Sequence, residues 1–391
     1  MTRRMRTLAL ATVILVASLA LLATNPAQAK VKGVCNDCHT MHNSQNGAPM
    51  ALNTDGTPDT TPNDSLLIYS ECLGCHKGDA DGTATNPWPK VYADSAPTVN
   101  NDGTFSNWQI TAGGNFYWVE NTADNCGHNI IATNQDDVLQ SGGPPGYNNL
   151  YTPTAGPARF GGTWNNQQLT CAGVNGCHGT TTTENQFGAI AGGHHSNIDG
   201  ACDGTDLPHS YRFLYGIKGI EDSNWEYTKD ANDHNQYYGI HRTDATILTS
   251  DKQTISYLCC ECHGDFHVSD TDTASASPWI RHPTDFDMAN ATGSEYEEYN
   301  EATNPAAAPY SLIAPVASDD AGETGGTVKS TVNVQTANGT AIVMCLSCHR
   351  AHGSPFADIL RWDYTLIEAA GSSTNDQNEG CFICHTTKDD S

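Results

Sequence analysis

Residues 35–42 read Cys35-Asn36-Asp37-Cys38-His39-Thr40-Met41-His42, and this stretch determines how the rest of the chain is interpreted. Two cysteines separated by two residues and followed at once by histidine form the attachment signature of c-type haem. The thiols form thioethers with the haem vinyl groups, and the histidine takes one axial position on the iron. A zinc ribbon also uses Cys-x-x-Cys pairs, but it gives no reason for the histidine after every pair.

The signature recurs along the chain, which predicts six covalently bound c haems. One copy is irregular, because five residues separate Cys171 from Cys177 before His178. The predicted attachment cysteines are Cys35, Cys38, Cys72, Cys75, Cys171, Cys177, Cys259, Cys262, Cys345, Cys348, Cys381 and Cys384. The predicted first axial ligands are His39, His76, His178, His263, His349 and His385.

The first 29 residues have the features of a secretory signal peptide. Arg3, Arg4 and Arg6 precede an apolar stretch, and small residues at 27–29 suit cleavage. Removing these three arginines takes the formal charge from −26 to −29. Such a chain is a poor partner for nucleic acid or anionic lipid. No later stretch is long and apolar enough to span a bilayer, so residues 30–391 are expected to form one exported unit.

The second axial ligand of each iron decides the function of a haem protein. Ten of the 16 histidines lie outside the attachment motifs, whereas only four methionines follow the signal peptide. This supply favours bis-histidine irons. The predicted second ligands are His42, His128, His195, His267, His282 and His352. His194, His209, His234 and His241 remain open as alternatives for the middle haems.

His42 lies three residues after His39, too close to reach the opposite face of the same haem. It is expected to ligate another haem, either in its own chain or in a neighbouring copy.

Several of these stretches carry a resemblance. The blocks Cys35–Ser44, 127–130, Cys259–His267, 281–283, Cys345–His352 and Cys381–His385 together resemble the OmcS-like family of extracellular multihaem cytochromes, which polymerise into filaments. The resemblance implies bis-histidine haems in alternating parallel and T-shaped stacks. It also implies a mostly irregular fold with short helices and a few β-hairpins, wrapped around those haems. In the family, the histidine matching His42 ligates the fifth haem of a neighbouring subunit. The five-residue spacing of the third site departs from the family pattern.

Local patterns give further structural expectations. Asn338-Gly339 between two partly alternating runs predicts a β-hairpin over residues 328–344. Residues 356–369 are compatible with one helix, and residues 289–325 with an acidic surface insertion. Cys126 and Cys202 are a plausible disulfide in an oxidising compartment.

Three functions compete at this stage. The favoured one is extracellular electron transfer by hopping from haem to haem along a head-to-tail filament that delivers electrons to extracellular acceptors, without enzymatic activity. The alternative is a discrete carrier in the periplasm or at the outer surface. A multihaem reductase is disfavoured, because all six motifs end in histidine and the negative charge repels anionic substrates.

Overall fold

The structure is a computed structural model that describes residues 33–44, 48–53, 57–60, 66–78, 88–99, 110–130, 143–147, 151–162, 168–196, 200–242, 248–267, 282, 284–290, 296–367 and 380–385. The predicted signal peptide lies outside these residues. Within them, short pieces of secondary structure are joined by irregular segments, and the fold-class prediction is confirmed. No helix in the described part of the chain is long and apolar enough to cross a membrane.

The helices and strands are all short. The α-helices are α2 (Leu73–His76), α3 (Tyr117–Asn121), α4 (Gln186–Ala189), α5 (Ile255–His263) and α6 (Cys345–Cys348). The 3-10 turns are η1 (Cys35–Asp37), η2 (Asp124–Cys126), η4 (Arg159–Gly162), η5 (Tyr211–Phe213), η6 (Asp251–Gln253), η7 (Gly264–Phe266), η8 (Met288–Asn290), η9 (Tyr299–Glu301), η10 (Pro305–Ala307), η11 (Ala357–Ile359), η12 (Tyr364–Leu366) and η13 (Gly380–Ile383). The strands are β1 (Thr170–Ala172), β2 (Gly176–His178), β3 (Ala201–Cys202), β4 (Gly219–Ile220), β5 (Gln236–Tyr237), β6 (Phe286–Asp287), β7 (Ala308–Pro309), β8 (Thr331–Val332) and β9 (Ile342–Val343).

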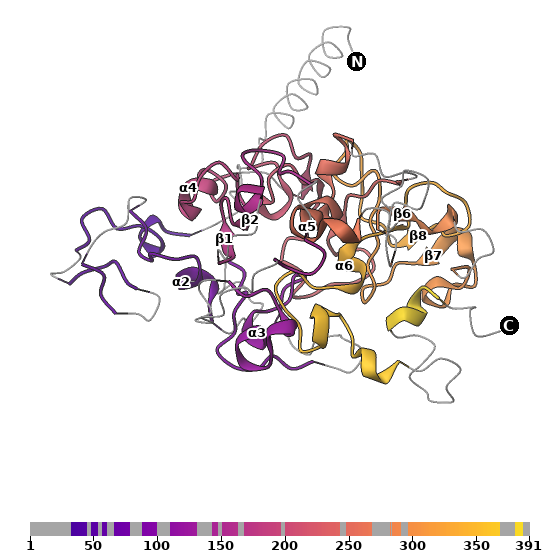
Figure 1. Cartoon of the computed structure of the whole chain (residues 1–391), viewed down its shortest axis with the longest axis horizontal. Helices are drawn as coiled ribbons and strands as arrows, with labels where there is room; N and C mark the ends of the chain where they lie inside the picture. Colours follow the sequence, from indigo (N-terminus) through magenta and orange to yellow (C-terminus); the bar gives the residue numbers. More distant parts are fainter. Residues whose placement is uncertain are drawn as a thin grey trace, which may run out of the picture.

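The strands form four small sheets. β1 and β2 pair in parallel, whereas β3-β4-β5, β6-β9 and β7-β8 are antiparallel. In Figure 1 the segment around residues 33–60 lies at one end, and α2, β1, α5 and α6 follow toward the other. The order of the attachment sites in space therefore largely follows their order in the sequence.

The five regular attachment motifs all lie on helical turns, namely η1, α2, the end of α5, α6 and η13. A helical turn places residues i and i+3 on one face, with Cβ atoms about 5–6 Å apart, so the two cysteines point in the same direction. The longest of these elements, α5, begins at Thr254, whose hydroxyl accepts a hydrogen bond from the Tyr257 amide at 3.1 Å. This N-cap satisfies one of the free amides of the first turn.

Apolar side chains form several separate clusters. The largest joins Met288 and Tyr299 to buried residues of 302–343, Trp362 and Ile383. The prediction that residues 289–325 form a surface insertion is wrong, because Tyr299, Ala308 and Val316 are fully buried in this cluster. The acidic composition of the segment masked these widely spaced apolar residues.

The hairpin predicted over residues 328–344 does not form. β8 pairs with β7, and β9 pairs with β6. Gly339 instead donates its amide to Asp287 at 2.9 Å and accepts from the Asp319 amide at 2.8 Å. These long-range bonds separate the two strands at the turn.

The helix predicted within residues 356–369 is also wrong in the part that the structure describes, residues 356–367. This segment contains only the turns η11 and η12, and Asp358 and Ile359 have positive φ. The backbone carbonyls of Asp358 and Ile359 accept hydrogen bonds from His349 Nδ1 and the Arg350 amide. The segment thus pairs with the fifth attachment motif, and its carbonyls are not available for helical bonds.

Candidate haem-binding sites

Five of the six attachment histidines lie opposite a second histidine ring. The pairs are His39–His195, His76–His194, His178–His352, His263–His128 and His385–His282, with ring centroids 6.0, 6.3, 6.4, 6.1 and 6.1 Å apart. Each pair joins segments that are distant in the sequence. The separation is nearly constant, whereas the angle between the two rings varies from 36° to 89°.

That separation suits an iron between the two rings. A bond from a metal to an imidazole nitrogen is roughly 2 Å long, and the ring centre lies about 1 Å beyond the nitrogen, so two imidazoles on opposite sides of one metal have centroids about 6 Å apart. The residues present therefore fit bis-histidine haem at five sites. The geometry selects His194 and His195 together, where the sequence left a choice between them.

Hydrogen bonds fix the orientation of these rings. The Nδ1 atoms of His76, His178, His263 and His349 donate to the carbonyls of Pro89, Arg212, Pro145 and Asp358, at 2.8, 2.9, 2.8 and 2.8 Å. His128 makes the same contact with Ala351 at 2.7 Å. A proton held on Nδ1 leaves the lone pair of Nε2 free for a metal.

Burial also keeps the rings neutral, because the charged form loses its hydration. Burial lowers the pKa of His352 to about 3, and the pKa values of His194 and His263 to about 4. The pKa values of His76, His128 and His178 shift in the same direction for the same main reason. Neutral imidazole is the form that binds a metal.

A loop contact positions His352. Its amide donates to the carbonyl of Gly113 at 2.7 Å, and its carbonyl accepts from the His128 amide at 3.1 Å. His352 and His128 are thereby held side by side, and each faces a different attachment histidine. His352 lies opposite His178, the histidine of the third motif, and not opposite His349, which it follows by three residues.

The fifth site differs from the others. Among the described residues, His349 alone of the six attachment histidines has no histidine ring opposite it, and its side chain is exposed. His42 is also exposed and faces no attachment histidine within the described part of the chain. Figure 1 places the segment of His42 and the helix α6, which precedes His349, on opposite sides of β1 and α5.

The structure does not support His267 as an iron ligand. Its ring is 1% exposed, and Nε2 lies 2.8 Å from the carboxylate of Asp285, while Nδ1 contacts Arg242 and the Tyr151 hydroxyl. Both ring nitrogens are thus engaged within a buried polar cluster. A position four residues after an attachment histidine suggested ligation, but η7 turns the chain away.

The remaining histidines also have other partners. His209 pairs with Asp206, His234 stacks on Tyr310 at 4.0 Å, and His241 accepts from the Asp287 amide at 3.2 Å. None of the three faces an attachment histidine in the described part of the chain.

The attachment cysteines of successive sites are neighbours. Cys171 of site three is the main influence on the pKa of Cys72 in site two, and Cys345 of site five is the main influence on the pKa of Cys259 in site four. The thiol pairs Cys38–Cys75, Cys177–Cys262 and Cys348–Cys381 lie within electrostatic range of one another. The attachment cysteines of each site therefore lie close to those of the next, so the six sites form one series.

A buried cation lies beside the fifth and sixth sites. Arg361 is 1% exposed and donates from Nε to the Leu346 carbonyl at 2.7 Å. Its Nη1 is buried without a hydrogen-bond partner among the described residues. An unsatisfied guanidinium nitrogen at this position suits a carboxylate, which haem carries on its propionates.

The suggested disulfide is absent. Cys126 and Cys202 are both buried without a disulfide between them, and they lie in different apolar clusters. Their pairing could not be judged from sequence, because both behave as small apolar residues.

Comparison with known proteins agrees with this geometry. Residues 338–390, which contain the last two attachment motifs, match the family described as a doubled CXXCH motif. The chain is 28% identical to the C-type cytochrome OmcS of Geobacter sulfurreducens, over 92% of this chain and 87% of the relative. The chain resembles OmcS. The resemblance predicted from a few motifs is confirmed, and it covers most of both sequences.

Two solved structures of OmcS are also similar. The outer membrane cytochrome S filament from Geobacter sulfurreducens is 20% identical with a TM-score of 0.45, over 89% of this chain and 88% of that chain. The OmcS nanowires of the same organism give 20% identity and a TM-score of 0.45, over 93% of each chain.

Proposed function

We propose that this protein is an extracellular hexahaem c-type cytochrome that transfers electrons by hopping from haem to haem along a filament of its own copies. The observation that carries the proposal is the set of five histidine pairs at 6.0–6.4 Å, together with one attachment histidine that has no partner ring. The similarity to OmcS, described from nanowires, supports the same assignment.

The proposed ligand set follows the pairs. His39, His76, His178, His263 and His385 would each share an iron with His195, His194, His352, His128 and His282, in that order. Bound haem supplies one-electron iron chemistry, and two histidine ligands leave the iron no open position for a substrate. The chain's own contribution is to hold neutral rings in place through carbonyl contacts.

The path along the chain follows the series of neighbouring thiols. Cysteines of each attachment site lie close to cysteines of the next one, so the six haems would lie in close succession from residue 35 to residue 385.

The interface between copies would use His42 and His349. We propose that His42 of one subunit ligates the fifth haem of the next, because both side chains are exposed and their segments lie far apart in one chain. Such a contact joins two different surfaces of the subunit, so it is heterologous. Heterologous contacts of this type generate open filaments when the rotation does not form a ring.

Electron microscopy of the protein shed from cells tests the proposal. Filaments that contain this chain, with low-spin haem spectra and reversible reduction, are expected. Monodisperse particles at all concentrations would favour the discrete carrier. A stoichiometric high-spin signal in the assembled protein, with turnover of one small oxyanion, would favour the reductase.

A further inference from the structure

The third attachment site has a different backbone from the other five. In the parallel pair β1–β2, Thr170 lies opposite Gly176 and Ala172 opposite His178, so Cys171 and Cys177 are cross-strand neighbours. Neighbouring strands are separated by about 5 Å, which matches the spacing of residues i and i+3 on a helical turn. A small strand pair thus presents the two thiols much as the regular motif does.

The inserted residues form a closed loop. The Gly176 amide donates to the Gly173 carbonyl at 3.0 Å, and the Thr170 amide donates to the Asn175 carbonyl at 2.9 Å. Gly173 has φ +91°, and a Cβ at Gly176 would lie 2.5 Å from the Ala172 nitrogen. The backbones of residues 172 and 176 approach each other so closely that only glycine fits at position 176.

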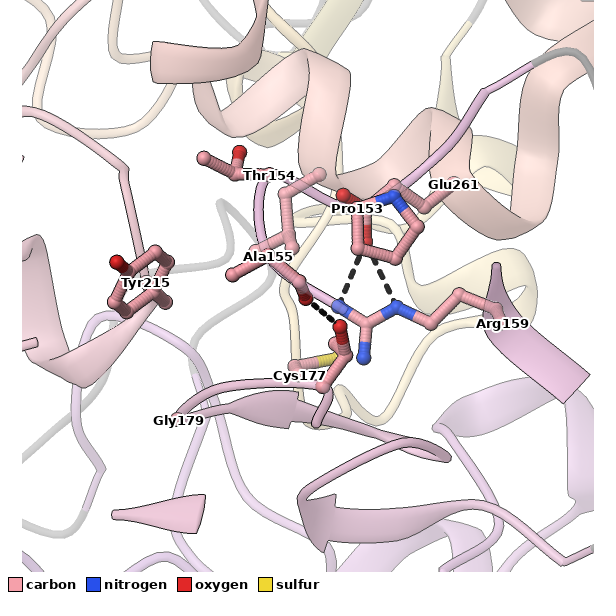
Figure 2. Close-up of a pocket in the computed structure, with 10 residues that line it drawn as sticks. Pro153, Thr154, Ala155, Arg159, Cys177, Gly179, Tyr215 and Glu261 are labelled. Atoms are coloured by element: carbon pink, nitrogen blue, oxygen red, sulfur yellow. Dashed lines mark hydrogen bonds and ion pairs between the residues drawn. The ribbon is translucent and has the colours of Figure 1, made fainter. Parts of the chain in front are cut away.

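One buried side chain holds this loop. The Nη1 atom of Arg159 donates to the carbonyls of both Gly173 and Gly176, the first at 3.2 Å. Arg159 is 6% exposed, and its Nε and Nη2 lie 2.8 and 2.7 Å from the carboxylate of Glu261. Figure 2 shows this guanidinium beside Cys177, with two of its nitrogens directed at Glu261.

The contact also joins two haem sites. Glu261 lies on α5 between Cys259 and Cys262 of the fourth motif, while the two carbonyls belong to the third. A buried ion pair gives weak net stability but a defined geometry when its hydrogen bonds are satisfied. Arg159 satisfies two loop carbonyls and one carboxylate at once.

We infer that Arg159 is a positioning residue for the third haem, one that the five-residue spacing makes necessary. It keeps Cys171, Cys177 and His178 in register and ties this site to α5. The inference rests on the proposed haem at this site. Attachment adds each thiol S–H across a vinyl C=C, forming a C–S bond and passing the hydrogen to the other vinyl carbon, so no oxidant is needed.

The test combines Arg159→Met with removal of the inserted residues. Deleting 173–175 leaves Cys171-Ala172-Gly176-Cys177-His178, which is a regular motif that needs no clamp. Intact mass gives the number of attached haems, and quantitative EPR gives the number of low-spin irons. We expect Arg159→Met to reduce the low-spin haems from six to five, and the deletion to restore six in the same variant.

The matched control is Arg361→Met, which removes an equally buried arginine at a regular site. The number of low-spin haems in Arg361→Met should be the same with and without residues 173–175. Six low-spin haems in Arg159→Met, beside six in the unaltered protein, would overturn the role of Arg159 alone. A defect that persists after the deletion, including failure to recover holoprotein in both backgrounds, would overturn it as well. Five haems in the unaltered protein would overturn the proposed third site itself.

Discussion

His234 is buried and His352 is half-buried, yet the less buried of the two rings is the one that faces an attachment histidine. His352 faces His178 at 6.4 Å, whereas His234 stacks on Tyr310 and has carbonyls near both ring nitrogens. The partner of the ring, and not its burial, separates a proposed iron ligand from a structural histidine.

Replacing each of these rings by phenylalanine tests the distinction. His352→Phe should retain six attached haems, since no thiol is changed, but one iron in six should become high-spin. His234→Phe should leave all irons low-spin. EPR together with intact mass measures both quantities. A fully low-spin spectrum for His352→Phe would refute its assignment to the third haem.

His267 differs from His352, because its position in the sequence suggested that it ligates iron, whereas its ring contacts Asp285, Arg242 and Tyr151. His267→Leu would remove the ring nitrogen that contacts the buried Asp285 carboxylate. Leaving a buried polar group without its hydrogen-bond partner costs about 1–3 kcal/mol. Denaturant unfolding should show this loss, while the spectrum stays fully low-spin. A high-spin signal equal to one haem would restore His267 as a ligand.

At the scale of elements, the helices and strands of the described residues are short, and backbone contacts between distant segments hold the chain together. Gly114 bridges Gly353 next to His352, and a Cβ there would lie 2.0 Å from the Gly353 carbonyl oxygen. Gly192 has a similar positive φ, but nothing lies within 4 Å of its Cβ position. The two glycines therefore differ in contact and not in backbone conformation.

Alanine at each glycine separates these two effects. Gly192→Ala should cost about 1–2 kcal/mol from its left-handed backbone. Gly114→Ala should cost about 2 kcal/mol more, because the added methyl overlaps a backbone carbonyl that is part of a tight contact. Unfolding free energies measure the difference. Equal losses would show that the 114–353 contact is not tightly packed.

The attachment turns were predictable from sequence, whereas the elements between them were not. A fixed spacing of two cysteines and a histidine is a local constraint, and five such turns are helical as a result. The turn at Gly339 and the segment after Phe356 instead take their conformations from Asp287, Asp319 and His349. Local propensity cannot anticipate hydrogen bonds to residues that are distant in the sequence.

At the scale of the whole molecule, the histidine pairs join segments far apart in the sequence. His39 meets His195, and His385 meets His282, across separations that no spacing rule predicts. The sequence could give the supply of histidines, and its small number of methionines favoured bis-histidine ligation. The assignment of His194 to the second haem required the fold.

Assembly is also a property of the whole molecule, and it depends on the two exposed histidines. His42 lies near the start of the described residues, and His349 follows α6. If His42 of one subunit completes the fifth haem of the next, the haem series continues from copy to copy. In monomers, that one iron would lack its second ligand.

The most direct measurement is electron microscopy of His42→Ala, with intact mass and EPR on the same sample. We expect monomers that retain six haems and show one high-spin iron in six, while the unaltered protein forms filaments that are fully low-spin. His209→Ala, which removes another exposed histidine, should still form filaments. Filaments of normal length and stability from His42→Ala would contradict the proposed interface.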